Sequence, residues 1–197
     1  MNGLELIKHT AGGGVMTATT TGGSVDLVKN GKIEFTDATK IHVDKCFDVP
    51  ADPGDEPLYD NYLIVIRYAD TNTQTLQVRM RVSGSDNSTA SSYVAQRLRS
   101  FSTTVDGSRL TSDSMIAGAG QRSTSHSGTH LYMYGPNLAQ PTAMRSVHVS
   151  DQNGAYIYDN AGTHNQPTAY DGFTIFPGDQ SVDGALTIYG FTKGITP

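Results

Sequence analysis

The feature that most constrains this chain is a pair of strand-like segments near its centre, Tyr59–Tyr68 and Thr75–Val82. In the second segment, apolar residues occupy every second position from Leu76 to Val82. A period of two residues is typical of a β-strand with one buried face. In the first segment, Leu63–Ile66 is continuously apolar, as in a strand that is covered on both faces. The polar residues 69–73 lie between the two segments, so the pattern predicts a β-hairpin at the centre of an antiparallel sheet.

Turn signals divide much of the remaining chain into further short strands. Two Asn-Gly pairs stand between alternating segments, and Asn-Gly supplies the positive φ angles of a type I′ hairpin turn. A Pro-Gly-Asp turn separates the last two apolar segments in the same way. The predicted strand pairs are 25–28 with 32–35, 145–150 with 155–158, and 171–176 with 183–191.

One segment, Tyr93–Phe101, fits two periods. Val94, Leu98 and Phe101 have helical spacing, whereas every second residue from Tyr93 to Phe101 has strand spacing. We favour the strand, because the polar residues that follow and Asp106-Gly107 continue the segment as a hairpin.

Composition supports the same class of fold. Glu5, Glu34 and Glu56 are the only glutamates, and long stretches of good helix formers are few. Threonine and tyrosine, which suit pleated sheets, are frequent. About a dozen predicted strands separated by turn signals indicate an all-β fold, an antiparallel β-sandwich. A chain of 197 residues is long enough for one such domain, which we place at residues 25–197.

Residues 1–24 are rich in glycine and threonine and can bury little apolar surface to offset their ordering entropy. We therefore expect an extended assembly arm that a neighbouring subunit holds in place. The alternative is an arm that folds back onto its own domain, as chain termini often do. The residues that define the arm are Gly12, Gly13, Gly14, Thr19, Thr20 and Thr21.

Charge and composition exclude several functional classes. The formal net charge is −5, with 14 basic and 19 acidic residues, which gives no electrostatic case for nucleic acid. There is no apolar run of membrane-spanning length, and the first residues lack the pattern of a secretory signal. The single cysteine, Cys46, lies in an alternating run and is interpreted as a small core residue.

Motifs that carry catalysis or hold metal ions are weak. No nucleophile elbow, phosphate-binding loop or His-Glu-x-x-His motif occurs. His126 and His130 are four residues apart but lie where a loop enters a strand, so we do not expect their side chains to converge on a zinc ion. The carboxylates of the Pro-rich segment 50–57 fit a solvated turn better than a calcium loop, and those between Asp159 and Asp183 mostly border turns. We expect no enzymatic activity, no metal and no cofactor.

Alternating tyrosines give the best candidate binding residues. Two tyrosines share one face of a predicted strand, two share a face of another, and polar side chains follow them. Such a set could stack on and hydrogen-bond a saccharide ring. The alternative, which we favour, is sheet packing at a subunit contact, because tyrosine is also enriched at protein interfaces. The candidate residues are Tyr132, Tyr134, Tyr156, Tyr158, Asp159 and His164, with Asn160 and Asn165 nearby.

The order of these short motifs resembles that of a recurrent group of tailed-bacteriophage virion proteins. The resemblance spans about residues 32–192 and has one departure, because the pattern usually runs almost directly from Phe47 to Tyr59 without the insert at 50–57. The motifs that carry it are Ile33–Thr36, Ile41–Phe47, Tyr59–Ile66, Leu76–Asp86, Tyr170–Ile175 and Gly184–Phe191.

The resemblance implies a jelly-roll-like sandwich at the virion surface, made in the host cytoplasm and commonly assembled as a homotrimer. Proteins of this group are tail fibres, minor structural proteins or head decorations, and the resemblance implies no catalytic residues. We therefore expect a structural protein that contacts other virion proteins, as a capsid decoration or cement protein or a short fibre. The alternative is a tail-fibre adhesin that binds host surface polysaccharide.

Overall fold

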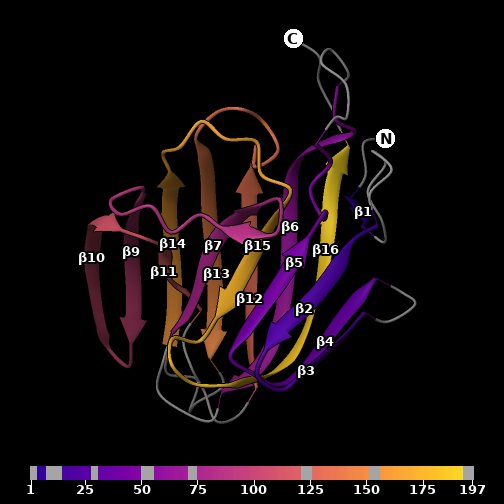
Figure 1. Ribbon diagram of the computed structural model, residues 1–197. Coiled ribbons are helices and arrows are strands. Elements are labelled where there is room, and N and C mark those ends of the chain that lie inside the picture. Colours follow the sequence, from indigo (N-terminus) through magenta and orange to yellow (C-terminus); the bar gives the residue numbers. More distant parts are fainter. Residues whose placement is uncertain are drawn as a thin grey trace.

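The computed structural model describes residues 4–7, 15–27, 31–49, 56–70, 75–120, 126–150 and 156–192. These residues form sixteen strands and no helix, in two antiparallel sheets that pack against each other (Figure 1). The described part of the chain therefore holds no helix that could cross a membrane. The predicted all-β sandwich is confirmed.

The larger sheet has ten strands and runs the full width of the molecule. Its strands pair in the order β10-β9-β14-β13-β12-β6-β16-β4-β3, and β1 adds to β16 beside β4. Their bounds are β1 Leu4–Leu6, β3 Ser24–Leu27, β4 Lys32–Ala38, β6 Tyr59–Asp70, β9 Tyr93–Phe101, β10 Thr104–Asp113, β12 Ser127–Tyr134, β13 Thr142–Ser150, β14 Tyr156–His164 and β16 Val182–Thr192.

The smaller sheet has six strands and covers one face of the larger one. Its order is β11-β7-β15-β5-β2, with β8 added to β7. The chain crosses repeatedly from one sheet to the other, which gives the fold its jelly-roll-like character. The bounds are β2 Thr17–Thr21, β5 Lys40–Asp44, β7 Leu76–Val82, β8 Ser85–Asp86, β11 Ile116–Gly120 and β15 Gly172–Phe176.

The central strands β6 and β7 exist as predicted, but they do not pair, so the predicted hairpin is wrong. β6 lies between β12 and β16 in the larger sheet, whereas β7 lies between β11 and β15 in the smaller one. Packed sheets lie about 10 Å apart, and a few extended residues span that distance. A short polar connection therefore permits a crossing between sheets as readily as a hairpin.

The last two strands, β15 and β16, also cross between sheets instead of forming the expected pair. β15 pairs with β5 and β7, and β16 pairs with β4 and β6. Gly172 starts β15 at a very close approach to β5, because a Cβ at this position would meet the Val43 carbonyl oxygen at 2.1 Å. The absence of a side chain at this position is thus a condition for that pairing.

Three other local predictions agree with the structure, although Asp106-Gly107 lies within β10 and is not a turn. β3 pairs with β4, and β13 pairs with β14, as the Asn-Gly turns indicated. Tyr93–Phe101 is a strand, β9, which the turn Ser102–Thr103 joins to β10. The turn residues 151–155 and the loop residues 50–55 lie outside the described residues.

The described parts of the N-terminal segment belong to the domain itself. β1 pairs with β16, and β2 pairs with β5 along its whole length, from Thr17 to Thr21. Within one chain, this is the arrangement in which the arm folds back onto its own domain. Thr19–Thr21 are residues of β2, and Gly12–Gly14 lie outside the described residues.

Apolar side chains from both sheets fill the space between them. Half of the largest fully buried side chains are aromatic, and Cys46 is also fully buried, in agreement with its predicted role. The Phe47 and Tyr62 rings lie 4.7 Å apart between centroids, so the two sheets meet partly through aromatic contacts. Other rings in this core are Tyr68, Tyr93, Tyr170 and Phe173.

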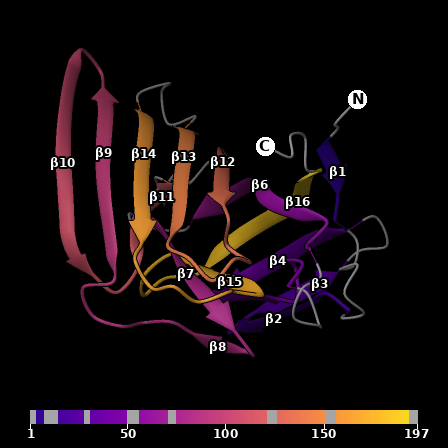
Figure 2. The ribbon, with the colours of Figure 1, turned by 90° about the horizontal axis from the view of Figure 1, so that it is seen from above.

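The two sheets do not match in width, and the excess lies at the β9–β10 end. These two strands extend beyond the smaller sheet at one side of the molecule (Figures 1 and 2). β10 is an edge strand of ten residues, eight of which are exposed, including residues that point to either face. We call the second half of β9 (97–101) together with β10 the overhang. Because no strand of the described smaller sheet covers it, its side chains remain available to a ligand or partner.

Candidate functional site

The six candidate residues of the sequence lie on opposite faces of the larger sheet. In antiparallel strands, residues directly opposite each other point to the same face. Tyr132 and Tyr134 on β12 point to the outer face, away from the smaller sheet, as does Asp159 on β14. Tyr156, Tyr158 and His164 point to the inner face. These residues therefore cannot form one binding site.

His164 is a core residue. It has no exposed surface, and its ring stacks on Tyr93 with 4.1 Å between centroids. Nδ1 lies 3.2 Å from the Ser92 carbonyl oxygen and Nε2 lies 2.5 Å from the Tyr170 hydroxyl. An N–H at Nδ1 donates to the carbonyl oxygen, so Nε2 accepts from the tyrosine. Burial lowers the pKa of His164, so the ring is a neutral packing element.

On the outer face, the two tyrosines of β12 form a small aromatic group. The Tyr132 and Tyr134 rings are almost parallel with centroids 6.4 Å apart, and Phe191 of β16 lies 6.5 Å from Tyr132. Arg145 on β13 is opposite Tyr132 and makes two hydrogen bonds with Asp159, Nε to Oδ1 at 2.9 Å and Nη2 to Oδ2 at 2.5 Å. The hydrogen bonds from Arg145 hold the pKa of Asp159 below its ordinary value. Asp159 is thus half of a surface ion pair.

An exposed apolar stripe continues this outer face toward β10. Val149, Ile157, Ser100 and Val105 are in register across β13, β14, β9 and β10, and Leu98 precedes Ser100 by two residues on the same face. The exposed fractions are 56% for Val149, 54% for Ile157, 56% for Leu98 and 66% for Val105. Outward positions of a half-buried sheet are ordinarily polar. We call the four apolar residues Leu98, Val105, Val149 and Ile157 the outer stripe.

A hollow of about 620 Å³ adjoins the outer stripe at β12 and β13. Gly128 forms part of its wall, and a Cβ at this position would meet no atom within 4 Å. The lining includes Val65, Arg67, Gly128, His130, Val147 and Val149, so the hollow is mainly apolar with basic side chains at its margin. Together, the stripe and the hollow give the outer face an uneven apolar surface.

The inner face of the overhang has a different character. Arg97, Arg99 and Phe101 continue the face that Tyr93 and Ala95 bury in the core. Phe101 stacks on Tyr156 of β14 with 4.4 Å between centroids, and 44% of its surface is exposed. Arg99 donates from both Nε and Nη2 to the carboxylate of Asp106 on β10. This face therefore combines an exposed aromatic stack with guanidinium groups.

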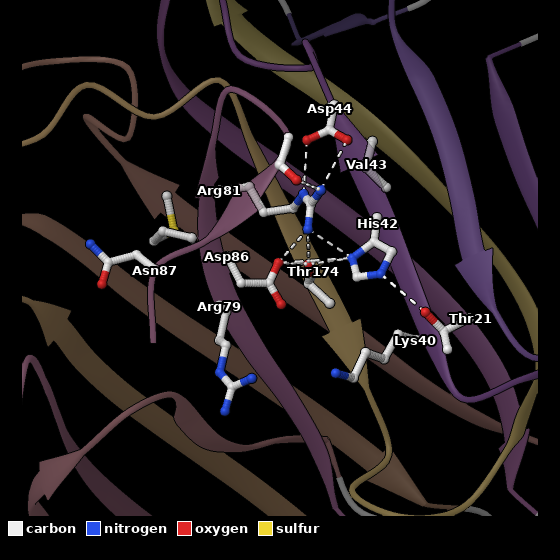
Figure 3. A network of polar contacts seen from close by, with 12 residues as sticks. Thr21, Lys40, His42, Val43, Asp44, Arg79, Arg81, Asp86, Asn87 and Thr174 are labelled. Atoms are coloured by element: carbon white, nitrogen blue, oxygen red, sulfur yellow. Dashed lines mark hydrogen bonds and ion pairs between the residues drawn. The ribbon is translucent and has the colours of Figure 1, made fainter. Parts of the chain in front are cut away.

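A second polar cluster lies on the outer face of the smaller sheet, around the buried side chain of Arg81 (Figure 3). Arg81 donates to Asp44 from Nε at 2.8 Å and from Nη2 at 3.3 Å, and to Asp86 from Nη1. Nη1 also lies 3.2 Å from the Thr174 hydroxyl and 2.9 Å from His42 Nδ1, and Nη2 donates to the Gly84 carbonyl oxygen at 2.5 Å. One guanidinium thus links β5, β7, β8 and β15.

The Arg81 cluster has the residue types of a catalytic site, but its polar groups already have hydrogen-bond partners within the cluster. Because Arg81 is a donor only, the Nδ1 of His42 is the acceptor of their hydrogen bond, and the ring is neutral. Burial, and then the charge of Arg81, lowers the pKa of His42. The Thr174 hydroxyl donates to Asp86 at 2.5 Å, so it also has a fixed partner. These contacts fit an ionic clamp between strands better than acid–base chemistry.

Metal and thiol chemistry receive no support from the described residues. Within them, no three His, Cys, Asp or Glu side chains are grouped so that they could hold a metal ion. Cys46 is fully buried, and burial raises the pKa of its thiol well above the ordinary value. A buried thiol with a raised pKa is a poor nucleophile at neutral pH.

No known family model matches the chain, and no curated protein matches its sequence.

Sequence reasoning missed both the outer stripe and the arginine-bearing face of the overhang. The alternation in β9 already separates Arg97, Arg99 and Phe101 from Leu98 and Ser100. It does not show that the smaller sheet stops short of these residues, because that follows from the pairing of distant strands. The signal available in the sequence was that β9 carries large side chains on both of its faces.

Proposed function

We propose that this chain is a non-enzymatic structural protein of a tailed-bacteriophage particle, located at the virion surface as a capsid decoration or cement protein or as a short fibre. The observation that supports assembly is the outer stripe together with the bare edge of β10. The resemblance of the sequence motifs to phage virion proteins supports the setting and favours a homotrimer.

The outer stripe suits a protein contact. Its four side chains are more than half exposed and lie side by side across neighbouring strands. Removing apolar surface from water stabilises a complex by roughly 25 cal/mol per Å². Contiguous exposed apolar surface on a folded protein is typical of interaction sites. A second copy of the chain, or a neighbouring virion protein, would cover it.

The edge of β10 supports the same conclusion. Natural sheets protect edge strands by keeping them short or by placing proline, lysine or a bulge there. The other edges described are short, with four residues in β3 and five each in β2 and β11. β10 has ten residues, contains no proline or lysine, and has its register irregularity only near its end, between Leu110 and Asp113. A partner that pairs with β10 would cover this long exposed edge.

Assembly can be tested by placing charge on the outer stripe. We expect the purified protein to be an oligomer by light scattering after size exclusion, and the double variant Val149→Lys and Ile157→Lys to be monomeric. A matched control, Ser85→Lys and Thr89→Lys, adds the same charge at exposed positions elsewhere and should leave the oligomer intact. A monomeric parent protein, or an oligomer that survives both double variants, would contradict assembly through the outer stripe.

A specific observation favours a second candidate function, attachment to host surface polysaccharide as a tail-fibre adhesin. The stack of Phe101 on Tyr156 is open to solvent on a face that no second layer covers. Exposed aromatic rings bordered by hydrogen-bonding groups are a common basis for sugar binding. Glycan binding that is lost in Tyr156→Ala would support this candidate.

Particles with and without the protein separate the two functions. If the protein is a decoration or cement protein, particles that lack it should release DNA at lower temperature while host adsorption is unchanged. If it is an adhesin, adsorption should fall while particle stability is unchanged. Particles that keep both properties would contradict both candidates.

A further inference from the structure

Arg97 lies on the inner face of the overhang. It is in register with Asn160 on β14 and with Ser108 on β10, so its cross-strand neighbours are an amide and a hydroxyl. Arg81, Arg99 and Arg145 each have a carboxylate partner, and Arg79 donates to the Ser114 carbonyl oxygen and lies over the Phe176 ring. Among the described residues, Arg97 forms no ion pair at contact distance.

The side chain of Arg97 is also incompletely hydrogen-bonded. The residue is half-buried, and its Nε is shielded from solvent without an acceptor among the described groups. Leaving a shielded donor without an acceptor costs about 1–3 kcal/mol, and more for a charged group. Asp106 receives hydrogen bonds from Arg99 at both carboxylate oxygens, and no hydrogen bond joins it to Arg97 among those described. The hydrogen bonds from Arg99 and, to a smaller extent, the charge of Arg97 lower the pKa of Asp106.

A small polar pocket lies at this position. Its volume is about 150 Å³, and its walls are Arg97, Arg99, Asp106, Gly107 and Ser108. Two guanidinium groups and one carboxylate leave a net positive charge in the pocket of a chain whose formal charge is −5. An oxyanion is the ligand that matches a fork of guanidinium donors beside a hydroxyl.

The aromatic stack lies on the same face, at the other end of the overhang. Phe101 follows Arg97 by four residues, which at about 3.3 Å per residue in a strand separates them by about 13 Å. Arg99 and Asp106 lie between the two and offer both donors and acceptors at their margins. This surface is longer than one sugar ring, so it fits at least two linked sugars.

We propose that the inner face of the overhang binds an acidic oligosaccharide, with a sugar carboxylate at Arg97 and a neighbouring ring against Phe101 and Tyr156. This inference deepens the second candidate function, polysaccharide attachment, and rests on it. The polar pocket selects the anionic group, whereas the aromatic stack selects the ring. Both elements lie on the inner surface of the overhang.

The test is isothermal titration calorimetry of the purified protein with three probes. The probes are an oligogalacturonate, a neutral maltooligosaccharide of equal length, and inorganic sulfate. We expect the oligogalacturonate to bind and the neutral sugar and sulfate to bind at least tenfold more weakly. Arg97→Gln should weaken oligogalacturonate binding by about tenfold, the usual effect of losing a charged hydrogen bond. Phe101→Ala should weaken it as well, while sulfate binding stays unchanged.

A matched control is available on the adjacent strand. Arg109 lies on β10 with its side chain on the outer face, opposite Gln96. Arg109→Gln removes the same charge and should leave oligogalacturonate binding intact, with melting temperatures of both variants showing that the fold is retained. Equal losses in Arg97→Gln and Arg109→Gln would mean general charge attraction and would overturn the proposed site.

The remaining outcomes separate this inference from the proposal on which it rests. Equal binding of neutral and acidic oligosaccharides overturns the acidic preference but supports a polysaccharide adhesin. If sulfate binds as tightly as the oligogalacturonate, and Phe101→Ala does not change its affinity, the proposed role of the sugar ring is overturned. No binding to any of the oligosaccharides contradicts both the acidic site and the adhesin, and leaves assembly as the supported function.

Discussion

Arg81 and Arg97 lie on strands of the same sandwich, yet their surroundings are opposite. Arg81 is buried, and its guanidinium contacts two carboxylates, a threonine hydroxyl, a histidine and a backbone carbonyl (Figure 3). Arg97 is half-buried beside an amide and a hydroxyl, with its Nε unbonded among the described groups. The first cluster has more residue types that resemble a catalytic site, but the second has the free capacity to bind.

Residue types alone therefore do not identify a functional cluster. In the Arg81 cluster, each charged group forms an ion pair with a group from another strand, so the cluster stabilises the smaller sheet. In the overhang, Arg97 forms no ion pair at contact distance among the described residues, and no described strand of the smaller sheet covers the aromatic stack. The predictions below test this contrast, beginning with stability.

The largest effect is expected for Arg81→Met. Removing the guanidinium leaves Asp44 and Asp86 close together and partly buried without their cation. Breaking a buried ion pair by removing one partner typically costs about 3–5 kcal/mol. We expect a loss of that size in the free energy of unfolding, measured by urea denaturation at pH 7. Arg97→Met should cause no loss, because it removes a donor that has no acceptor among the described groups.

If the two methionine variants lose similar stability, the contrast between the arginines fails. A loss in Arg97→Met alone would show that Arg97 has a structural partner in the folded protein. A useful addition is Arg81→Lys, which keeps the charge but not the fork of donors, and should recover only part of the stability.

A smaller effect concerns acid pH and another buried polar group, His148 on β13. The ring has no exposed surface, and burial lowers its pKa to about 4. An unfolded histidine titrates near 6.5, so between pH 6.5 and 4 the unfolded state binds a proton that the native state does not. The native state is therefore fully stable above pH 6.5 and loses about 3 kcal/mol as the pH falls through this window.

The measurement is the free energy of unfolding at pH 7.5, 5.5 and 4.5 for the parent protein and for His148→Gln. The variant should show a weaker dependence on pH, although His42 and His164, whose pKa values are also lowered, keep part of it. His130→Gln is the control, because His130 is on the neighbouring strand with its side chain exposed. An unchanged pH profile in His148→Gln would mean that the ring titrates normally in the native protein.

Much of the local structure could be predicted from the sequence. Alternation located β7 and β9, and the Asn-Gly pairs located the pairings of β3 with β4 and β13 with β14. These features depend on side chains within a few residues of each other. The buried state of Cys46 was predicted from its residue type, because a free cysteine behaves as a small apolar side chain.

The pairing of distant strands could not be predicted in this way. The connection after β6 and the Pro-Gly-Asp turn before β16 suggested hairpins, but both carry the chain to the other sheet. A turn fixes how the chain reverses and not which sheet receives the next strand. The candidate site failed for a related reason, since Tyr132 and Tyr156 both alternate correctly but face opposite sides of the sheet.

The smallest effect is expected at the exposed ion pair of Arg145 and Asp159. Its geometry is as close as that around Arg81, with Nε to Oδ1 at 2.9 Å, but the side chains are 54% and 38% exposed. Water and salt screen such a pair, so most exposed pairs contribute little to stability. Asp159→Asn should therefore leave the urea midpoint of unfolding unchanged within error, at both low and high salt. If Asp159→Asn instead destabilises the protein in a concentration-dependent way, the pair lies in a subunit contact, and the outer face is covered in the assembled protein.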